Sequence, residues 1–509
     1  MKSYPAAQFN KSRDAYDAAV ANLSGVDAGG LEHAEVERRV QAGGLEVMRC
    51  LMQDHLDLRT EQEKASLEPM RGADGELRTE RRPSERSLGS LFGTVTVHRM
   101  ALVKHGVEGG LRPLDARLNL PDGLYSAGVE REAVWGVAQA SYDATVDNLH
   151  RTTGTKIAKR QVEELVVRAA VDFQEFYLTR PRQAERKDQL LILTFDGSGV
   201  VMRPDGLREE TRKKAEKSRR KRSAAETAGS VGRAKDEDHS RKRMAEVAAV
   251  YALDPVARSP DDVVRELRRT GPHKARPKAQ NKRVWASVER SILDVVDDAF
   301  YEALQRDEAR ERRWVALVDG NADQLAAIRR LAHNIDVTVT IVLDFIHVLG
   351  YLWKAGQALQ GDAPAAVEAW VSERATKILK GEAVLVAAGM RRSATRRRLE
   401  GNRRKAVDAC ANYLLNHKRY LRYHEYLRDG LPIATGVIEG ACRSLVQDRM
   451  DITGARWGLQ GAEAVLKVRS LRASDDLDEY FDFHAARERE RNHLCHYDQN
   501  ELIDLREAA

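Results

Sequence analysis

Two short apolar runs in this 509-residue chain end on the same dipeptide, and this repetition constrains the fold most strongly. The first run, 190–195, leads into Asp196, the second, 314–318, leads into Asp319, and a glycine follows each aspartate. Apolar runs of this length bounded by a turn dipeptide are typical of buried strands. Each run therefore predicts a strand that carries an aspartate to its C-terminal end, within an α/β fold.

A third acid, Glu439, stands in the segment 434–440. Acids from such distant segments can meet only through folding, and carboxylates brought together repel one another unless a divalent cation lies between them. We therefore expect Asp196, Asp319 and Glu439 to be catalytic residues that bind Mg²⁺ or Mn²⁺. Two such ions about 4 Å apart support phosphoryl transfer without a protein nucleophile. The alternative is that each Asp-Gly pair only forms a turn.

The charge of the chain favours a polyanionic partner. The net charge is +6, and the basic residues cluster in 204–243 and 391–405, which we expect to contact DNA phosphates unless they are simply solvated. The four cysteines are widely spaced and form no CxxC pair, which argues against a disulfide framework. We therefore expect a protein of the reducing cytoplasm, associated with the nucleoid. No apolar stretch approaches about 20 residues, so no membrane partner is expected.

The hydrophobic patterns divide the chain into six segments. They are an N-terminal helical region (1–86, ending in a polar linker from 71), a small hairpin and connector (87–122), a helix-turn-helix-like DNA-binding region (123–180), the first part of an α/β core with the basic loop 204–243 (181–362), a helical insertion (363–428), and the second part of the core with C-terminal helices (429–509). The strands expected in the core are 189–195, 198–203, 244–252, 314–318 and 335–343.

Helical periodicity predicts three helices near 126–138, 141–150 and 155–177, a spacing compatible with a helix-turn-helix. The third helix would place four polar side chains against phosphates or base edges: Lys156, Lys159, Arg160 and Gln161. The alternative is a plain helical hairpin with a solvated basic end.

Several segments together resemble the DDE transposases of bacterial insertion sequences, specifically the ISKra type. The matching stretches are 114–121, 193–200, 316–321, 436–442, 448–457 and 461–464, within roughly residues 87–497. The resemblance implies an RNase H-like core and assigns Asp196, Asp319 and Glu439 to its acidic triad. Asp344 and His347, after the last expected strand, resemble an Asp-x-x-His pattern of related transposases, and their alternative is a helix cap with a packed histidine.

The resemblance also implies the function and the partners. The protein would bind the terminal inverted repeats of a mobile element, cleave the double-stranded DNA and join it to target DNA, as a homodimer or higher oligomer on DNA. Arg449, Arg456 and Trp457 could hold a phosphate and stack on an unpaired base, or could pack internally. A catalytically silent DNA-binding protein and a metal-dependent nuclease without strand transfer are the alternatives.

Overall fold

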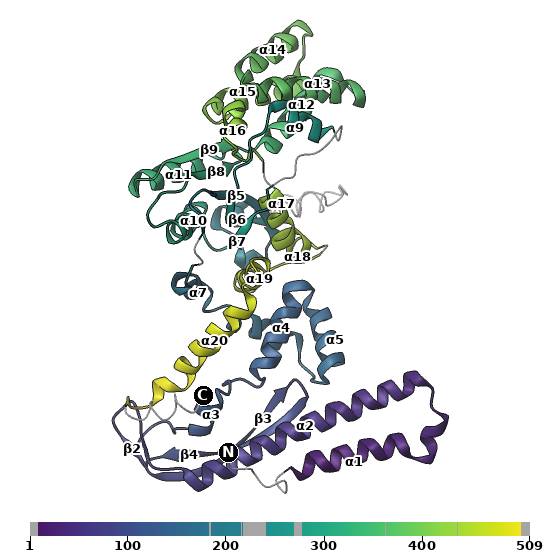
Figure 1. Ribbon diagram of the computed structural model, residues 1–509, viewed down its shortest axis with the longest axis vertical. Coiled ribbons are helices and arrows are strands. Elements are labelled where there is room, and N and C mark those ends of the chain that lie inside the picture. The colour runs from purple at the N-terminus through teal and green to yellow at the C-terminus, as the bar shows by residue number, and fades with distance from the viewer. Residues whose placement is uncertain are drawn as a thin grey trace. The chain divides into compact units, whose positions relative to one another are not determined.

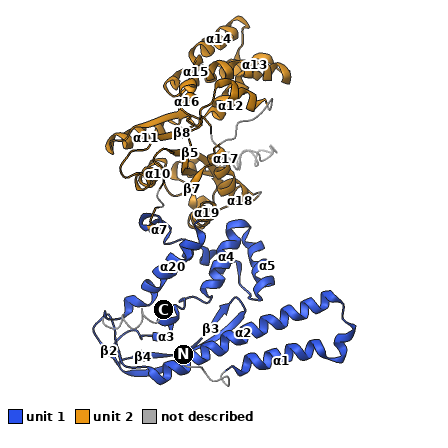
Figure 2. Ribbon diagram, viewed as in Figure 1, with its two compact units in different colours: residues 1–179, 476–509 blue, residues 180–475 orange. Residues whose placement is uncertain are grey.

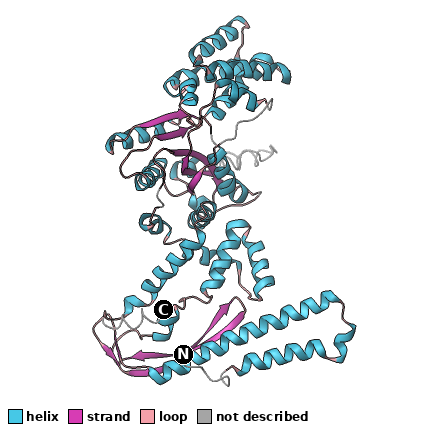
Figure 3. Ribbon diagram, in the orientation of Figure 1, coloured by secondary structure: helices cyan, strands magenta, loops and turns pink. Residues whose placement is uncertain are grey.

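The computed structural model describes residues 9–182, 185–214, 216, 241–268, 277–361, 363–434, 436–452 and 454–499. The protein is mixed α/β (Figure 3) and divides into two compact units (Figure 2). Unit 1 comprises residues 1–179 and 476–509, and unit 2 comprises residues 180–475. The sequence patterns grouped 476–509 with the core, whereas the structure places these residues in unit 1. Among the described helices, none combines the length and apolarity that a membrane crossing requires.

Unit 1 opens with two antiparallel helices, α1 (Asn10–Ser24) and α2 (His33–Ser66), followed by short strands β1 (Met70–Arg71) and β2 (Leu77–Arg78). A hairpin of β3 (Glu80–Ser90) and β4 (Gly93–Val103) packs on α2. Treating 71–86 wholly as a linker was wrong, because residues 80–86 pair with β4. Pro83 is compatible with this strand, since a two-stranded sheet leaves each strand with a free edge.

The remaining helices of unit 1 are α3 (Pro113–Leu118), α4 (Ala127–Gln139), α5 (Tyr142–Thr153), α6 (Lys159–Ala169), α7 (Phe173–Thr179) and α20 (Leu477–Asn492). Ser126 and Ser141 cap α4 and α5 with their hydroxyls, which explains where these two helices begin. The single helix expected over 155–177 is instead α6 and α7. The break holds the buried Asp172, whose carboxylate lies 2.6 Å from His484 Nδ1 of α20.

Unit 2 contains a five-stranded sheet in the order β7-β6-β5-β8-β9. The strands are β5 (Leu190–Val201), β6 (Lys242–Leu253), β7 (Gln280–Ser287), β8 (Trp314–Val318) and β9 (Val339–Leu343). The first three form an antiparallel meander, and β8 and β9 run parallel to β5. Residues 198–201 continue β5 instead of forming a second strand, and β9 begins later than expected. Most of the basic loop 204–243 lies outside the described residues.

Helices surround this sheet. They are α9 (Pro260–Leu267), α10 (Ile292–Arg306), α11 (Ala322–Asn334), α12 (Phe345–Gln360), α13 (Pro364–Leu379), α14 (Ala383–Arg396), α15 (Gly401–Asn416), α16 (Tyr423–Arg428), α17 (Gly436–Ala441), α18 (Asp448–Met450) and α19 (Leu459–Ala473), with a π-helical turn at Cys442–Gln447. Figure 1 shows α10 and α17 on opposite sides of β5 and β6. Helix α19 covers the edge strand β7, whose Val284 and Ala286 amides donate to the hydroxyls of Ser474 and Ser470.

Candidate metal centre

The two Asp-Gly dipeptides adopt different structures. Asp319 directly follows β8 and begins a turn. In this turn Gly320 has φ +97°, and the Asp319 carboxylate accepts a hydrogen bond from the Asn321 amide at 2.8 Å. Asp196 lies inside β5, so the expectation that it ends a strand was wrong. The reason is that β6 pairs with β5 along its whole length, through Val201.

Parallel pairing nevertheless brings the two aspartates together. The β5–β8 register ends at Thr194 and Leu317, so each aspartate lies two residues beyond the last pair. His347, in the first turn of α12, joins them: Asp196, Asp319 and His347 each offer a ligand atom, and these atoms lie within 4.8 Å of one another. The buried Nδ1 of His347 has no hydrogen-bond partner among the described residues. The sequence predicted His347 only as part of an Asp-x-x-His pattern and did not predict it as a metal ligand.

This donor set fits a divalent cation. Ligand atoms about 2.1 Å from one ion lie up to about 4.2 Å apart, so only a small contraction would be needed for all three to bind together. Carboxylate oxygens suit Mg²⁺ and Mn²⁺, whereas an imidazole nitrogen is accepted more readily by a transition ion. The observation that favours a metal here is the meeting of two carboxylates and one imidazole from three separate segments.

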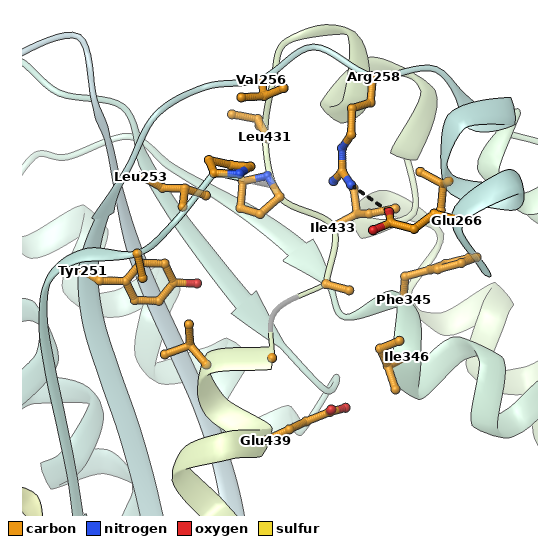
Figure 4. Close-up of a pocket in the computed structure, with 18 of the residues that line it drawn as sticks. Tyr251, Leu253, Val256, Arg258, Glu266, Phe345, Ile346, Leu431, Ile433 and Glu439 are labelled. Carbon is orange, nitrogen blue, oxygen red and sulfur yellow. Dashed lines mark ion pairs between the residues drawn. The ribbon is translucent and has the colours of Figure 1, made fainter. Parts of the chain in front are cut away.

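Glu439, the third acid of the expected triad, does not belong to this group of ligand atoms. It is exposed on α17, at the rim of a cavity of about 270 Å³ lined by Phe345 and Ile433 (Figure 4). The site is close, however, because Cys442, three residues further on, donates its thiol hydrogen to Asp196 Oδ2 at 3.4 Å. Burial, with the negative charges of Asp196 and Glu439, raises the pKa of the Cys442 thiol.

Asp344 is buried behind the cluster and caps α12. Its carboxylate accepts a hydrogen bond from the Ile346 amide at 2.7 Å, and its own amide donates to the Val318 carbonyl oxygen at 2.8 Å. Burial, together with the charges of Glu439 and Asp196, raises the pKa of Asp344 to about 6. Asp344 is therefore a helix cap that also adds negative potential beside the candidate ligands.

Three residues that sequence reasoning missed also shape the site. Tyr413 of α15 donates its hydroxyl hydrogen to the Asp319 carbonyl oxygen at 2.6 Å, and His417 Nε2 lies 3.1 Å from the Gly320 carbonyl oxygen. The helical insertion thus supports the Asp319 turn.

The third residue is Glu246 of β6, which pairs with β5. Burial raises the pKa of Glu246, and the charges of Asp196 and Asp319 add to this effect. A lone acid in the otherwise apolar run 245–253 was the available signal for Glu246.

The residues expected to read DNA in unit 1 divide into two kinds. Lys156, Lys159 and Arg160 are exposed at the start of α6, where Lys159 pairs with Asp143 at 2.8 Å. Gln161 is engaged locally, because its side-chain oxygen accepts hydrogen bonds from the Tyr125 hydroxyl at 2.6 Å and the Ala158 amide at 3.2 Å. The oxygen of Gln161 thus takes part in the start of α6, and base reading by its amide nitrogen stays a prediction.

In unit 2, the Arg449 guanidinium lies 4.8 Å from the centre of the Trp457 ring, and both side chains are buried. Trp457 was therefore wrongly expected to stack on a base, since its ring lies in the interior, while Arg456 is exposed. Within the basic run 391–405, Arg403 donates to the Ala358 carbonyl oxygen at 2.8 Å and so supports the end of α12.

The chain matches no protein-family model and no curated protein, so these comparisons do not assign it to a family.

Proposed function

We propose that the protein is a metal-dependent DNA transposase of the DDE class with an RNase H-like core. The observation that carries the proposal is the convergence of Asp196, Asp319 and His347 from three separate segments, with Glu439 on the adjoining helix. The mixed sheet, with the order β7-β6-β5-β8-β9, supports an α/β core in which the parallel strands β5 and β8 are neighbours. The acids lie where β5 and β8 stop pairing.

Each residue has a role in this proposal. Asp196, Asp319 and His347 would hold the cation, and Glu439 would complete the site once DNA brings α17 closer to it. When bound, Mg²⁺ or Mn²⁺ supplies charge neutralisation at the scissile phosphate and activation of the attacking oxygen. Asp344 keeps α12, and with it His347, in position. The exposed Lys156, Lys159 and Arg160 would bind phosphates of the element's ends.

A second candidate is a DNA-binding protein that no longer cleaves. The exposed position of Glu439, outside the group of ligand atoms, favours this candidate. A nuclease without strand transfer would share the metal centre and would differ only in failing to join a cut end to a second DNA.

The experiment compares the parent with Asp196→Asn, on DNA that carries the sequences flanking the gene on both sides. We expect cleavage in Mg²⁺ or Mn²⁺ to fall at least about 100-fold in the variant, since a ligand charge is lost, while binding without metal persists. Asp323→Asn, an exposed carboxylate on α11, is the matched control. Joining of a pre-cut end to a plasmid separates the transposase from the nuclease. If Asp196→Asn cleaves at the parental rate, the proposed function is wrong.

A further inference from the structure

The helix that carries Glu439 changes its winding three residues further on. Helix α17 continues directly into the π-helical turn Cys442–Gln447 and then into α18. The Asp448 amide shows the new winding, because it donates to the carbonyl oxygen of Arg443, five residues earlier. In an α-helix this amide would donate to Ser444, four residues earlier. The π-helical winding thus deprives the Ser444 carbonyl oxygen of its usual donor.

Arg469 of α19 supplies a donor in its place. The guanidinium donates to the carbonyl oxygen of Ser444, and Nε donates to that of Leu445 at 3.0 Å. The side chain is buried, and this burial, with the charges of Arg449 and Arg472, lowers the pKa of Arg469 to about 10. Burying a cation is unfavourable unless hydrogen bonds compensate for the lost water. Arg469 and the π-helical turn therefore stabilise each other.

The buried side chains of this helix recur every four residues. They include Ile438, Cys442, Val446 and Met450, each at most 4% exposed. Four residues of an α-helix turn by about 400°, so in a regular α-helix Met450 would point about 120° away from Ile438. The π-helical turn removes this drift and keeps all four side chains against the core. The winding therefore sets how the two ends of the helix are rotated relative to each other.

The N-terminal end of this helix meets the candidate metal centre. Cys442 donates its thiol hydrogen to Asp196, and Glu439 lies one turn earlier, at the rim of the cavity (Figure 4). Gaining or losing one residue of winding rotates the part before it by about 100°, which would turn Cys442 away from Asp196. π-Helical turns inside α-helices are rare and frequently lie at functional sites.

We propose that Arg469 is a positioning residue for the metal centre, which fixes the rotation of α17 by holding the π-helical turn. Without its guanidinium, the carbonyl oxygen of Ser444 regains a donor when the segment rewinds as an α-helix. Rewinding rotates α17 about its axis and breaks the hydrogen bond from Cys442 to Asp196. The part that Glu439 takes in catalysis rests on the proposed function, whereas the effect on Cys442 does not.

The test is the rate at which a thiol reagent modifies Cys442, followed by mass spectrometry in a Cys495→Ser background that lacks the exposed cysteine. We expect slow modification in the parent and at least about 10-fold faster modification in Arg469→Leu, because the thiol becomes exposed. Arg472→Leu, which replaces an exposed arginine of the same helix, is the matched control and should keep the parental rate. A parental rate in Arg469→Leu overturns the proposal.

Deletion of Ser444 gives a second test, which is decisive even if Arg469→Leu alone fails to fold. With one residue fewer, the rotation from Ile438 to Met450 in an α-helix is within about 20° of three full turns. An α-helix then keeps both ends in place and needs no donor from Arg469. We therefore expect the deletion combined with Arg469→Leu to fold and to restore slow modification of Cys442. Rapid modification or unfolding of the combined variant would contradict the proposal.

Calorimetric titration with Mn²⁺ connects this role to the metal centre. Arg469→Leu should weaken binding several-fold, because Asp196 loses the hydrogen bond that orients its carboxylate, and the combined variant should restore the affinity. Equal affinity in the parent and Arg469→Leu overturns the positioning role. If the parent binds no Mn²⁺, the proposed function fails, and the thiol measurements still decide whether Arg469 fixes the rotation of α17.

Discussion

Replacing Asp344 by asparagine should change how the stability of unit 2 depends on pH. Asp344 is only 4% exposed, and the pKa of its carboxyl in the folded protein is about 6, against 3.8 for an ordinary aspartate. Because the folded-state pKa is the higher one, the protonated carboxyl contributes stability that is full below pH 3.8 and is lost as the pH rises through about 6. The rise in pKa corresponds to about 3 kcal/mol.

Asparagine keeps the cap on α12 but carries no charge at any pH. With a chelator present, we therefore expect Asp344→Asn to match the parent near pH 4 and to exceed its free energy of unfolding by up to about 3 kcal/mol at pH 7. Urea unfolding followed by tryptophan fluorescence reports on unit 2, which holds five of the six tryptophans, all except Trp135. Asp323→Asn is the exposed control. Parallel pH profiles of Asp344→Asn and the parent would refute the reasoning.

Three further outcomes are expected. Tyr413→Phe loses one hydrogen bond to the Asp319 turn and should weaken Mn²⁺ binding several-fold in calorimetry, with little change in Tm. The double variant Lys159→Ala, Arg160→Ala should bind DNA with a shallower slope of log affinity against log salt concentration. In gel-shift titrations the slope should fall by one to about two, because up to two fewer counterions are released. Burial opposes the charge on His484, but hydrogen bonds to Asp172 and Glu130 outweigh it and raise its pKa to about 9. Parental stability should therefore fall by up to about 3 kcal/mol from pH 6.5 to 9, and His484→Gln should abolish that fall in urea titrations followed by circular dichroism.

Sequence reasoning located the strands that begin with, or consist of, a run of apolar residues. β5 and β8 were expected because such runs have few other uses in a globular protein. β7 was missed, because Gln280–Arg283 is polar and its pairing with β6 is specified by neighbours distant in the chain. The same limit applies to Asp196, since a glycine after an aspartate predicts a turn, whereas the long pairing with β6 keeps the strand straight.

The candidate site was predictable only in part, for a similar reason. Asp196 and Asp319 follow directly from their strands, but the place of His347 depends on β9 lying parallel to β8, which no local pattern specifies. The support from Tyr413 was not predictable at all. An aromatic residue in a helix is usually a packing residue, and only the tertiary structure shows its hydroxyl at the Asp319 carbonyl oxygen.

The division of unit 1 into 1–179 and 476–509 has a consequence for synthesis on the ribosome. Helix α20 completes unit 1, since Tyr480 donates to the Ala169 carbonyl oxygen at 2.6 Å and His484 lies between Asp172 and Glu130. These residues are translated only after the whole of unit 2, at about 5–20 residues per second. Unit 2 can thus reach its native structure first, and the proposed DNA-binding helices gain their supporting contacts from α20 only after all of unit 2 has been synthesised.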